Sequence, residues 1–200
     1  MTLSSPHSWR PVAVLLAFQA GLVALALSGL ARADEPVSPT LRVLLSVPRH
    51  VSDLEEDDGQ REERLKEIAA AIDAATPHAH ERALLLSVGW WESRWASYVQ
   101  FDAPKCHGEN HPACDHGRAF GPWQGWRMSR TETLDEQAAR ALSLLRYHAR
   151  RCGEPGLATP ASVRAGVSGY ATGGRVCRWP GAEKRVRTWR SVVGRLGGEA

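Results

Sequence analysis

The segment VGWWESRWAS, residues 88–97, surrounds one glutamate, Glu92, with three tryptophans. Burying an ionised carboxylate is costly unless the group is paired, and an apolar setting raises its pKa. Glu92 is therefore either an exposed helical residue that adjoins tryptophans, or an acid that is kept protonated for a chemical purpose. The rest of the sequence has to decide between these two interpretations.

A helix is predicted over residues 79–97, with Glu92 on its packed side. The expected apolar stripe consists of Leu84, Val88, Trp91 and Trp95. At about 100° per residue, Glu92 falls on this stripe between Leu85 and Val88. The carboxylate is thus expected to face the interior, close to the point where the helix gives way to a loop.

The remaining pattern predicts a mainly α fold in a single domain over residues 59–200. An irregular lead-in is expected over residues 34–58, with a short strand or helix at LRVLLSV. Thr133 and Glu136 form a capping-box pattern at the start of one helix, and Pro160 suits the first turn of another. No run of alternating strands is found. Further helices are predicted over about 59–75, 134–151, 160–170 and 181–194.

Residues 1–33 have the pattern of a secretory signal peptide. An apolar run follows Arg10, and the small residues Ala31 and Ala33 precede Asp34 as in a cleavage site. The alternative is an uncleaved membrane anchor, although Gln19 interrupts the run. We expect cleavage and a periplasmic or secreted protein.

The four cysteines of an exported chain predict two disulfides. Three pairings are possible, and we expect Cys106–Cys114 and Cys152–Cys177 because these close the shorter loops. Zinc is the alternative for the first pair, because His107, His111 and His116 lie beside it. The spacing matches no zinc pattern that we can state, so we predict no metal and no cofactor.

Charge is distributed unevenly along the chain. Residues 34–116 hold 8 Lys or Arg and 16 Asp or Glu, whereas residues 117–200 hold 15 and 6. The basic half could face an anionic polymer, but a solvated arginine surface explains most of these residues. The arginines are spread out, and export argues against a nucleic-acid partner. We expect a monomer that binds no nucleic acid.

Two further motifs follow Glu92: GRAFGPWQGW at residues 117–126 and SGYATGG at residues 168–174. Taken alone, the first can be a turn-rich loop in which glycine supplies positive φ and Trp123 packs. The second can be a helix C-cap followed by a turn.

Together with Glu92–Ser93, in this order, the motifs over residues 60–195 resemble the lysozyme-like fold of the soluble lytic transglycosylase family. The resemblance matches that family's glutamate–serine pair at a helix end and its Gly-x-x-Gln loop, here Gly121 to Gln124. A later tyrosine segment is matched loosely by Gly169 to Gly173, with Ala171 where the family has asparagine.

The resemblance implies cleavage of the β-1,4 bond between N-acetylmuramic acid and N-acetylglucosamine in peptidoglycan. It implies Glu92 as the single catalytic acid and base, with a 1,6-anhydro product formed as the substrate's N-acetyl group stabilises charge at C1. Apolar neighbours would raise the pKa of such an acid, as they do for the catalytic acid of hen-type lysozyme. The implied substrate-binding residues, which include candidate supports of Glu92, are Ser93, Trp123, Gln124 and Tyr170. Trp126 is expected either in the groove or in the core.

Two alternatives stay open at this point. A hydrolytic lysozyme of the same fold needs a second carboxylate, and Asp102 or Asp115 could supply it. A non-catalytic cell-wall-binding domain is favoured only by Ala171, where the family's asparagine is missing.

Overall fold

The computed structural model of the chain describes residues 36–97, 119–126 and 131–198. It divides the chain into two units, Met1–Val37 and Ser38–Ala200, and every element below belongs to the second. The predicted signal segment, the pair Cys106–Cys114, its zinc alternative and the carboxylates Asp102 and Asp115 lie outside the described residues. These expectations stay predictions.

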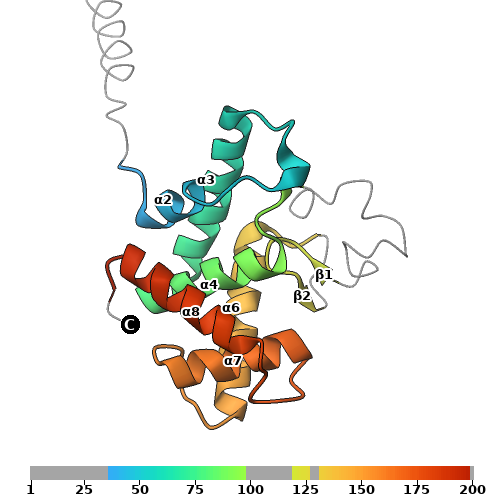
Figure 1. Cartoon of the computed structure of the whole chain (residues 1–200), viewed down its shortest axis with the longest axis vertical. Helices are drawn as coiled ribbons and strands as arrows, with labels where there is room; N and C mark the ends of the chain where they lie inside the picture. The colour runs from blue at the N-terminus through green and yellow to red at the C-terminus, as the bar shows by residue number, and fades with distance from the viewer. Residues whose placement is uncertain (1–35, 98–118, 127–130, 199–200) are drawn as a thin grey trace, which may run out of the picture. The chain divides into compact units, whose positions relative to one another are not determined.

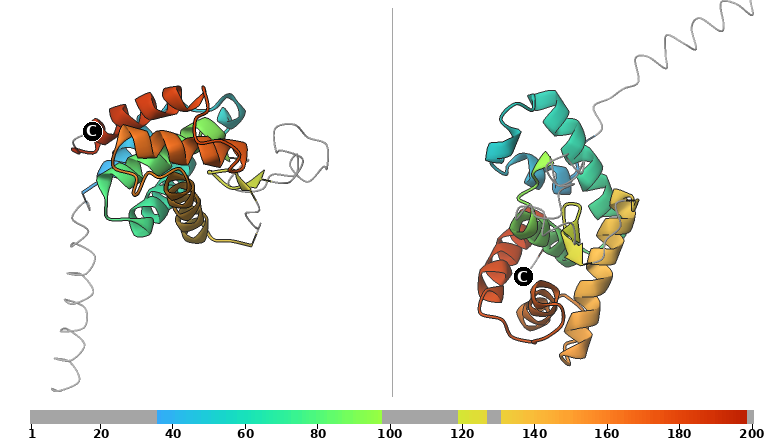
Figure 2. Two further views of the ribbon diagram at one scale, coloured as in Figure 1. Left: turned by 90° about the horizontal axis from the view of Figure 1, so that it is seen from below. Right: turned by 90° about the vertical axis from the view of Figure 1, so that its right-hand side faces the viewer.

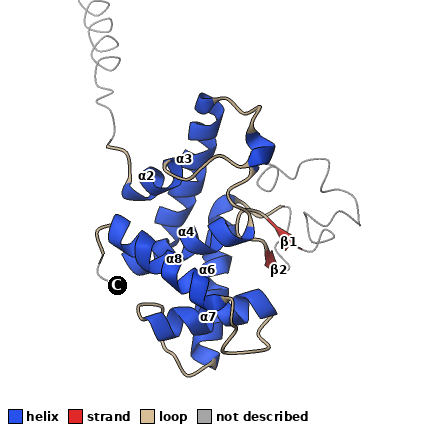
Figure 3. Ribbon diagram, viewed as in Figure 1, coloured by secondary structure: helices blue, strands red, loops and turns tan. Residues whose placement is uncertain are grey.

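The described part of the chain is mainly helical, as the sequence predicts (Figure 3). It has a short 3-10 turn, Val51–Asp53, and a small antiparallel hairpin, β1 (Ala119–Phe120) with β2 (Gly125–Trp126). None of the described helices has the length and apolar character needed to cross a membrane. The α-helices are α2 (Pro39–Leu45), α3 (Asp58–Ala75), α4 (Ala79–Glu92), α6 (Leu134–Arg151), α7 (Pro160–Thr172) and α8 (Ala182–Arg195).

Capping residues explain where several helices begin. Thr133 forms the expected capping box with Glu136 at the start of α6. Asp57 forms a capping box with Gln60 at the start of α3, so the acidic residues 55–58 supply the N-cap of this helix. Pro160 occupies the first turn of α7, where its missing N–H costs nothing. The observed bounds of α3, α6, α7 and α8 lie within two residues of the predicted bounds.

Helix α4 runs through the middle of the helical unit. It packs against α8 on one side and against α3 and α6 on the other (Figures 1 and 2). The α4 side chains Leu84, Leu85 and Val88 are at most 1% exposed, and Trp189 of α8 donates from its indole N–H to the carbonyl of His80 at 2.9 Å. This central position explains why most side chains of α4 are buried.

Residues 38–58 of the predicted lead-in belong to the helical unit. Its LRVLLSV stretch forms α2, the helical one of the two expected alternatives. Leu41, Val43 and Leu44 of α2 are buried in the same hydrophobic cluster as α4. Helix α2 thus shares the core of the helices that follow residue 59, and the sequence has no long apolar period there to reveal a seven-residue helix.

The predicted disulfide Cys152–Cys177 is present. It ties the C-cap of α6 to the loop that connects α7 with α8. The two cysteines are 25 residues apart in the sequence, so the bond restricts α7 and its following loop even in the unfolded chain.

Helix α4 ends at Glu92 and not at the predicted residue 97. Arg94 and Trp95 adopt φ of 51° and 58°, so the chain reverses and the Trp95 ring lies over Gly89. A Cβ on Gly89 would lie 2.0 Å from the Trp95 ring, so only glycine permits this contact. Trp91 was expected on the buried stripe, but it is 36% exposed, and its indole N–H donates to the hydroxyl of Thr188 at 3.2 Å.

Two glycine-to-alanine substitutions should have opposite effects on the free energy of unfolding. Gly89→Ala should destabilise the protein by about 1–3 kcal/mol, because the new methyl group overpacks the Trp95 ring. Gly194→Ala in α8 meets nothing within 4 Å and should stabilise the helix by about 0.5–1 kcal/mol. Urea unfolding measures both; equal effects of the two substitutions would contradict the packing of Trp95 on Gly89.

Candidate functional site

Glu92 is the last residue of α4 and is largely enclosed. Its side chain is 21% exposed, and its Oε1 accepts a hydrogen bond from Nη1 of Arg185 at 2.5 Å. Arg185, in the first turns of α8, has a side chain that is itself 11% exposed. The carboxyl is therefore neither free in solvent nor sealed in the core, which is the position that a proton donor needs.

Two opposing effects act on the pKa of Glu92. Burial raises the pKa because it disfavours the charged form, and the positive charge of Arg185 lowers it. Burial is the larger effect, so the pKa lies above the ordinary value of 4.5. The position at a helix C-terminus acts in the same direction as burial, because the negative end of the helix dipole repels a carboxylate.

Arg185 is held in place from its other side. Its guanidinium lies over the ring of Trp179, 5.0 Å from the centroid. The backbone N–H of Trp179 donates to Oγ of Ser168 at 3.0 Å, and Cys177 lies two residues before it in the disulfide-bonded loop. The disulfide and α7 thus fix the arginine that faces Glu92.

Tyr170 of α7 is the second neighbour of Glu92. Its pKa is raised, first by burial and then by the negative charge of Glu92. The hydroxyl donates to the backbone carbonyl of Trp123 at 2.8 Å. Tyr170 therefore stays neutral and connects the neighbourhood of Glu92 to the hairpin turn.

Trp123 was expected to contact substrate, and this expectation is wrong for its side chain. The indole is fully buried, donates to the carbonyl of Leu85 at 3.0 Å and meets Trp95 edge-on at 6.1 Å between ring centroids. A ring with no exposed face cannot stack on a sugar. The alternative, in which Trp123 packs below a turn-rich loop, is the one that the structure supports.

Gly121 and Gln124 form the turn between β1 and β2. Gly121 has φ of 73°, a backbone conformation that favours glycine, and a Cβ there would lie 1.7 Å from Oε1 of Gln137, so that side chain would have to move to admit it. The backbone N–H and the side-chain amide of Gln124 both donate to the carbonyl of Gly121, at 3.1 and 3.0 Å. Gln124 is partly exposed, and its side-chain amide is engaged inside its own turn.

Ser93 caps α4 and was wrongly grouped with the substrate-binding residues. The side chain is 7% exposed, and its hydroxyl donates to the carbonyl of Gly89 at 3.0 Å. The same oxygen accepts from the N–H of Trp95 at 3.1 Å. Both bonds stabilise the end of the helix, which agrees with the supporting role that we also considered.

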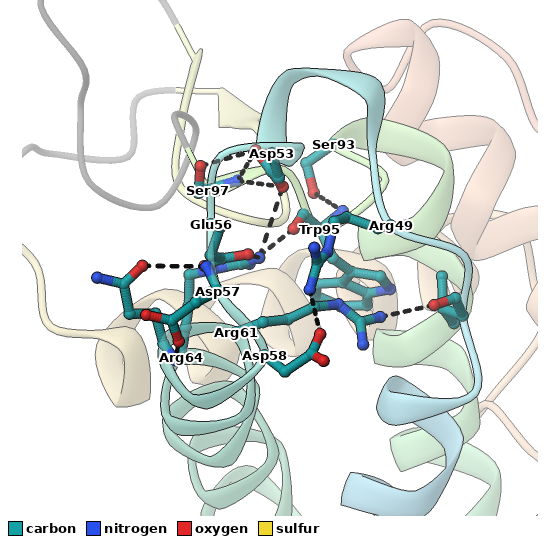
Figure 4. A network of polar contacts seen from close by, with 12 residues as sticks. Arg49, Asp53, Glu56, Asp57, Asp58, Arg61, Arg64, Ser93, Trp95 and Ser97 are labelled. Carbon is teal, nitrogen blue, oxygen red and sulfur yellow. Dashed lines mark hydrogen bonds and ion pairs between the residues drawn. The ribbon is translucent and has the colours of Figure 1, made fainter.

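A buried hydrogen-bond network around Arg64 holds the segment after α4 (Figure 4). The sequence did not reveal this network. Arg64 of α3 is 4% exposed and donates to the carbonyl of Trp95 at 2.7 Å. It also makes two 2.7 Å hydrogen bonds to Glu56, and Asp53 accepts from the N–H and hydroxyl of Ser97. This network fixes the chain that follows Glu92, because the Trp95 carbonyl has a buried charged partner.

Arg185 is the residue of this site that the sequence analysis missed. Several basic residues occur in α8, and none carries a motif. The available signal was helical phase, since Arg185 lies one turn before the buried Trp189. Residues one turn apart share a helix face, so Arg185 could have been placed beside the core.

No group of three or more metal-ligating side chains occurs among the described residues. Comparison with known proteins found no matching family model, no matching curated protein and no matching solved structure. The chemistry of this site therefore has to be argued from its own residues.

The raised pKa of Glu92 predicts a pH-dependent cost in stability. An acid whose pKa is raised in the folded state makes its full contribution to the free energy of unfolding at low pH. It loses that contribution as pH rises through the folded-state pKa. Glu92→Gln removes this loss, so the stability of the variant relative to the wild type should increase from about pH 4 to about pH 8. Urea unfolding across this range measures the difference.

Glu183→Gln is the matched control on α8. The pKa of Glu183 is lowered by its hydrogen bond to Arg164, so the stability of this variant relative to the wild type should decrease as pH rises, and this change should lie at and below about pH 4.5. A decrease in the relative stability of Glu92→Gln with rising pH would show that Arg185 outweighs burial.

Proposed function

We propose that this protein is a peptidoglycan lytic transglycosylase with a lysozyme-like fold. It cleaves the β-1,4 bond between N-acetylmuramic acid and N-acetylglucosamine, with Glu92 as acid and base. The single observation that supports this most is the partly buried carboxyl of Glu92 at the end of α4, with its raised pKa. General acid catalysis near neutral pH needs a carboxylic acid in such an environment.

In the proposed mechanism Glu92 first donates its proton to the glycosidic oxygen, and the bond from C1 to that oxygen breaks. The carbonyl oxygen of the substrate's own N-acetyl group stabilises the positive charge at C1. The resulting Glu92 carboxylate then takes the proton of the C6 hydroxyl, and O6 bonds to C1 to give the 1,6-anhydro product.

Arg185 suits the interval between the two proton transfers. Its 2.5 Å contact with Oε1 stabilises the carboxylate that exists after the first transfer. Burial favours the protonated form, which exists before the first transfer and again after the second. An acid that must also act as a base benefits from both effects, because neither protonation state is then strongly favoured.

The other expected residues take different roles in this proposal. Tyr170 and Gln124 position the substrate or support Glu92: the side chain of Gln124 is partly exposed, and Tyr170 adjoins Glu92. Trp123 and Ser93 act only through the backbone that they stabilise. The substrate lies outside the cytoplasm, so the proposal includes export by residues 1–33 to the periplasm or beyond, and action as a monomer without cofactor or nucleic acid.

A non-catalytic cell-wall-binding domain is the second candidate. The ion pair between Glu92 and Arg185 favours it, because a structural carboxylate is commonly paired with arginine. Under this candidate the purified protein binds sacculi and releases no glycan fragments.

Substitution of Glu92 tests the catalytic proposal. Glu92→Gln keeps the shape of the side chain but has no proton to donate, so release of soluble fragments from sacculi should fall at least about 100-fold. Mass spectrometry of the wild-type digest should find 1,6-anhydro ends. Glu183→Gln, which changes an exposed carboxylate of α8, should leave the rate within about twofold.

Unchanged release by Glu92→Gln would refute the role of Glu92 as the acid. A wild-type protein that binds sacculi without releasing fragments would support the binding domain instead.

The hydrolytic alternative predicts a different response of two further carboxylates. In a transglycosylase with one acid, Asp102→Asn and Asp115→Asn should each retain activity within about threefold. In a two-carboxylate lysozyme, one of them should lose about 100-fold or more, and the digest should contain reducing ends only. Rates and end-group analysis of the two variants decide between these reactions.

A further inference from the structure

A pocket of about 410 Å³ lies between α2, α4 and α8, and neither Glu92 nor Tyr170 lines it. Its volume is in the range of small-molecule sites. The floor is apolar and includes Leu44 and Val47 from the α2 region, Leu86 and Trp90 from α4, and Val192 from α8. Such a surface suits an aliphatic chain.

The rim of the pocket is basic. Arg187, Ser191 and Arg195 line it and are exposed. Their spacing of four residues puts them on one face of α8, and the two arginines are about 12 Å apart along the helix axis. None of the pocket-lining residues that the structure describes is acidic.

The two arginines differ in their partners. Arg195 donates to the hydroxyl of Ser46, which also lines the pocket. Arg187 has no carboxylate within ion-pair distance among the described residues. Glu183, one turn before it, is paired with Arg164 at 2.5 Å. Arg187 acts on Glu183 only at longer range than an ion pair, so its guanidinium can still bind an incoming anion.

We propose that this pocket binds a single-chain aliphatic anion, with the chain on the apolar floor and a carboxylate or phosphate head at Arg187. The arginine supplies charge and hydrogen bonds to the head, and burial of the chain supplies most of the affinity. Because Glu92, Arg185 and Tyr170 do not line the pocket, this proposal does not depend on glycan cleavage.

The direct test is a titration of the purified protein with decanoate, decyl phosphate, octanoate and decanol below their micelle concentrations. Trp90 and Trp95 line the pocket, so tryptophan fluorescence reports occupancy. Decanoate should bind about 15-fold more tightly than octanoate, because it buries two more methylenes and each is worth roughly a factor of four. Decanol should bind about 10-fold more weakly than decanoate.

Decyl phosphate identifies the head group, since the tighter of the two ten-carbon anions is the preferred class. Arg187→Gln should weaken decanoate about 10-fold and leave decanol unchanged. Arg190→Gln, an exposed α8 arginine that does not line the pocket, is the matched control and should change neither. Ser191→Trp should fill the pocket from its exposed rim and abolish binding of all four probes.

Several results would overturn the proposal. These are the absence of saturable binding by either ten-carbon anion, equal affinity for decanol and decanoate, and an equal loss in Arg187→Gln and Arg190→Gln. Binding that persists in a folded Ser191→Trp variant, with circular dichroism like that of the wild type, would place the ligand elsewhere.

Discussion

The contact of the Trp95 ring with Gly89 determines the candidate site, because it makes α4 stop at Glu92. A helix that continued to residue 97 would carry Trp95 onto its own stripe and leave Glu92 in the middle of a packed helix. The reversal is fixed from outside by Arg64, whose guanidinium binds the Trp95 carbonyl. The same reversal brings Trp95 edge-on to Trp123, and so links the end of α4 to the hairpin turn.

Two opposing effects then act on the pKa of the Glu92 carboxyl, and both arise from the packing around it. The packing that encloses it raises its pKa, and the arginine that the packing brings to it lowers its pKa. A fully buried carboxyl without a partner would stay protonated, and a solvated ion pair would stay charged. The intermediate setting is what links the fold of this chain to acid–base chemistry in our proposal.

Local rules predicted much of the helical framework. The capping box at Thr133 and the proline in the first turn of α7 correctly predicted where two helices begin. The end of α4 was not predicted, because it depends on Trp95 and Arg64, which are 31 residues apart. The roles of Trp123 and Arg185 also depend on contacts between distant segments. The resemblance implied a substrate contact for Trp123, and no motif pointed to Arg185.

The most direct test of the central claim is the titration of the Glu92 side-chain carboxyl by carbon-detected NMR of the folded protein. The account predicts a midpoint above the ordinary value of 4.5, and a further increase in an Arg185→Gln variant, because the lowering charge is then absent. A midpoint below 4.5 in the wild type would show that Arg185 dominates over burial. Glu92 would then be a structural partner of that arginine, and the proposed acid would be lost.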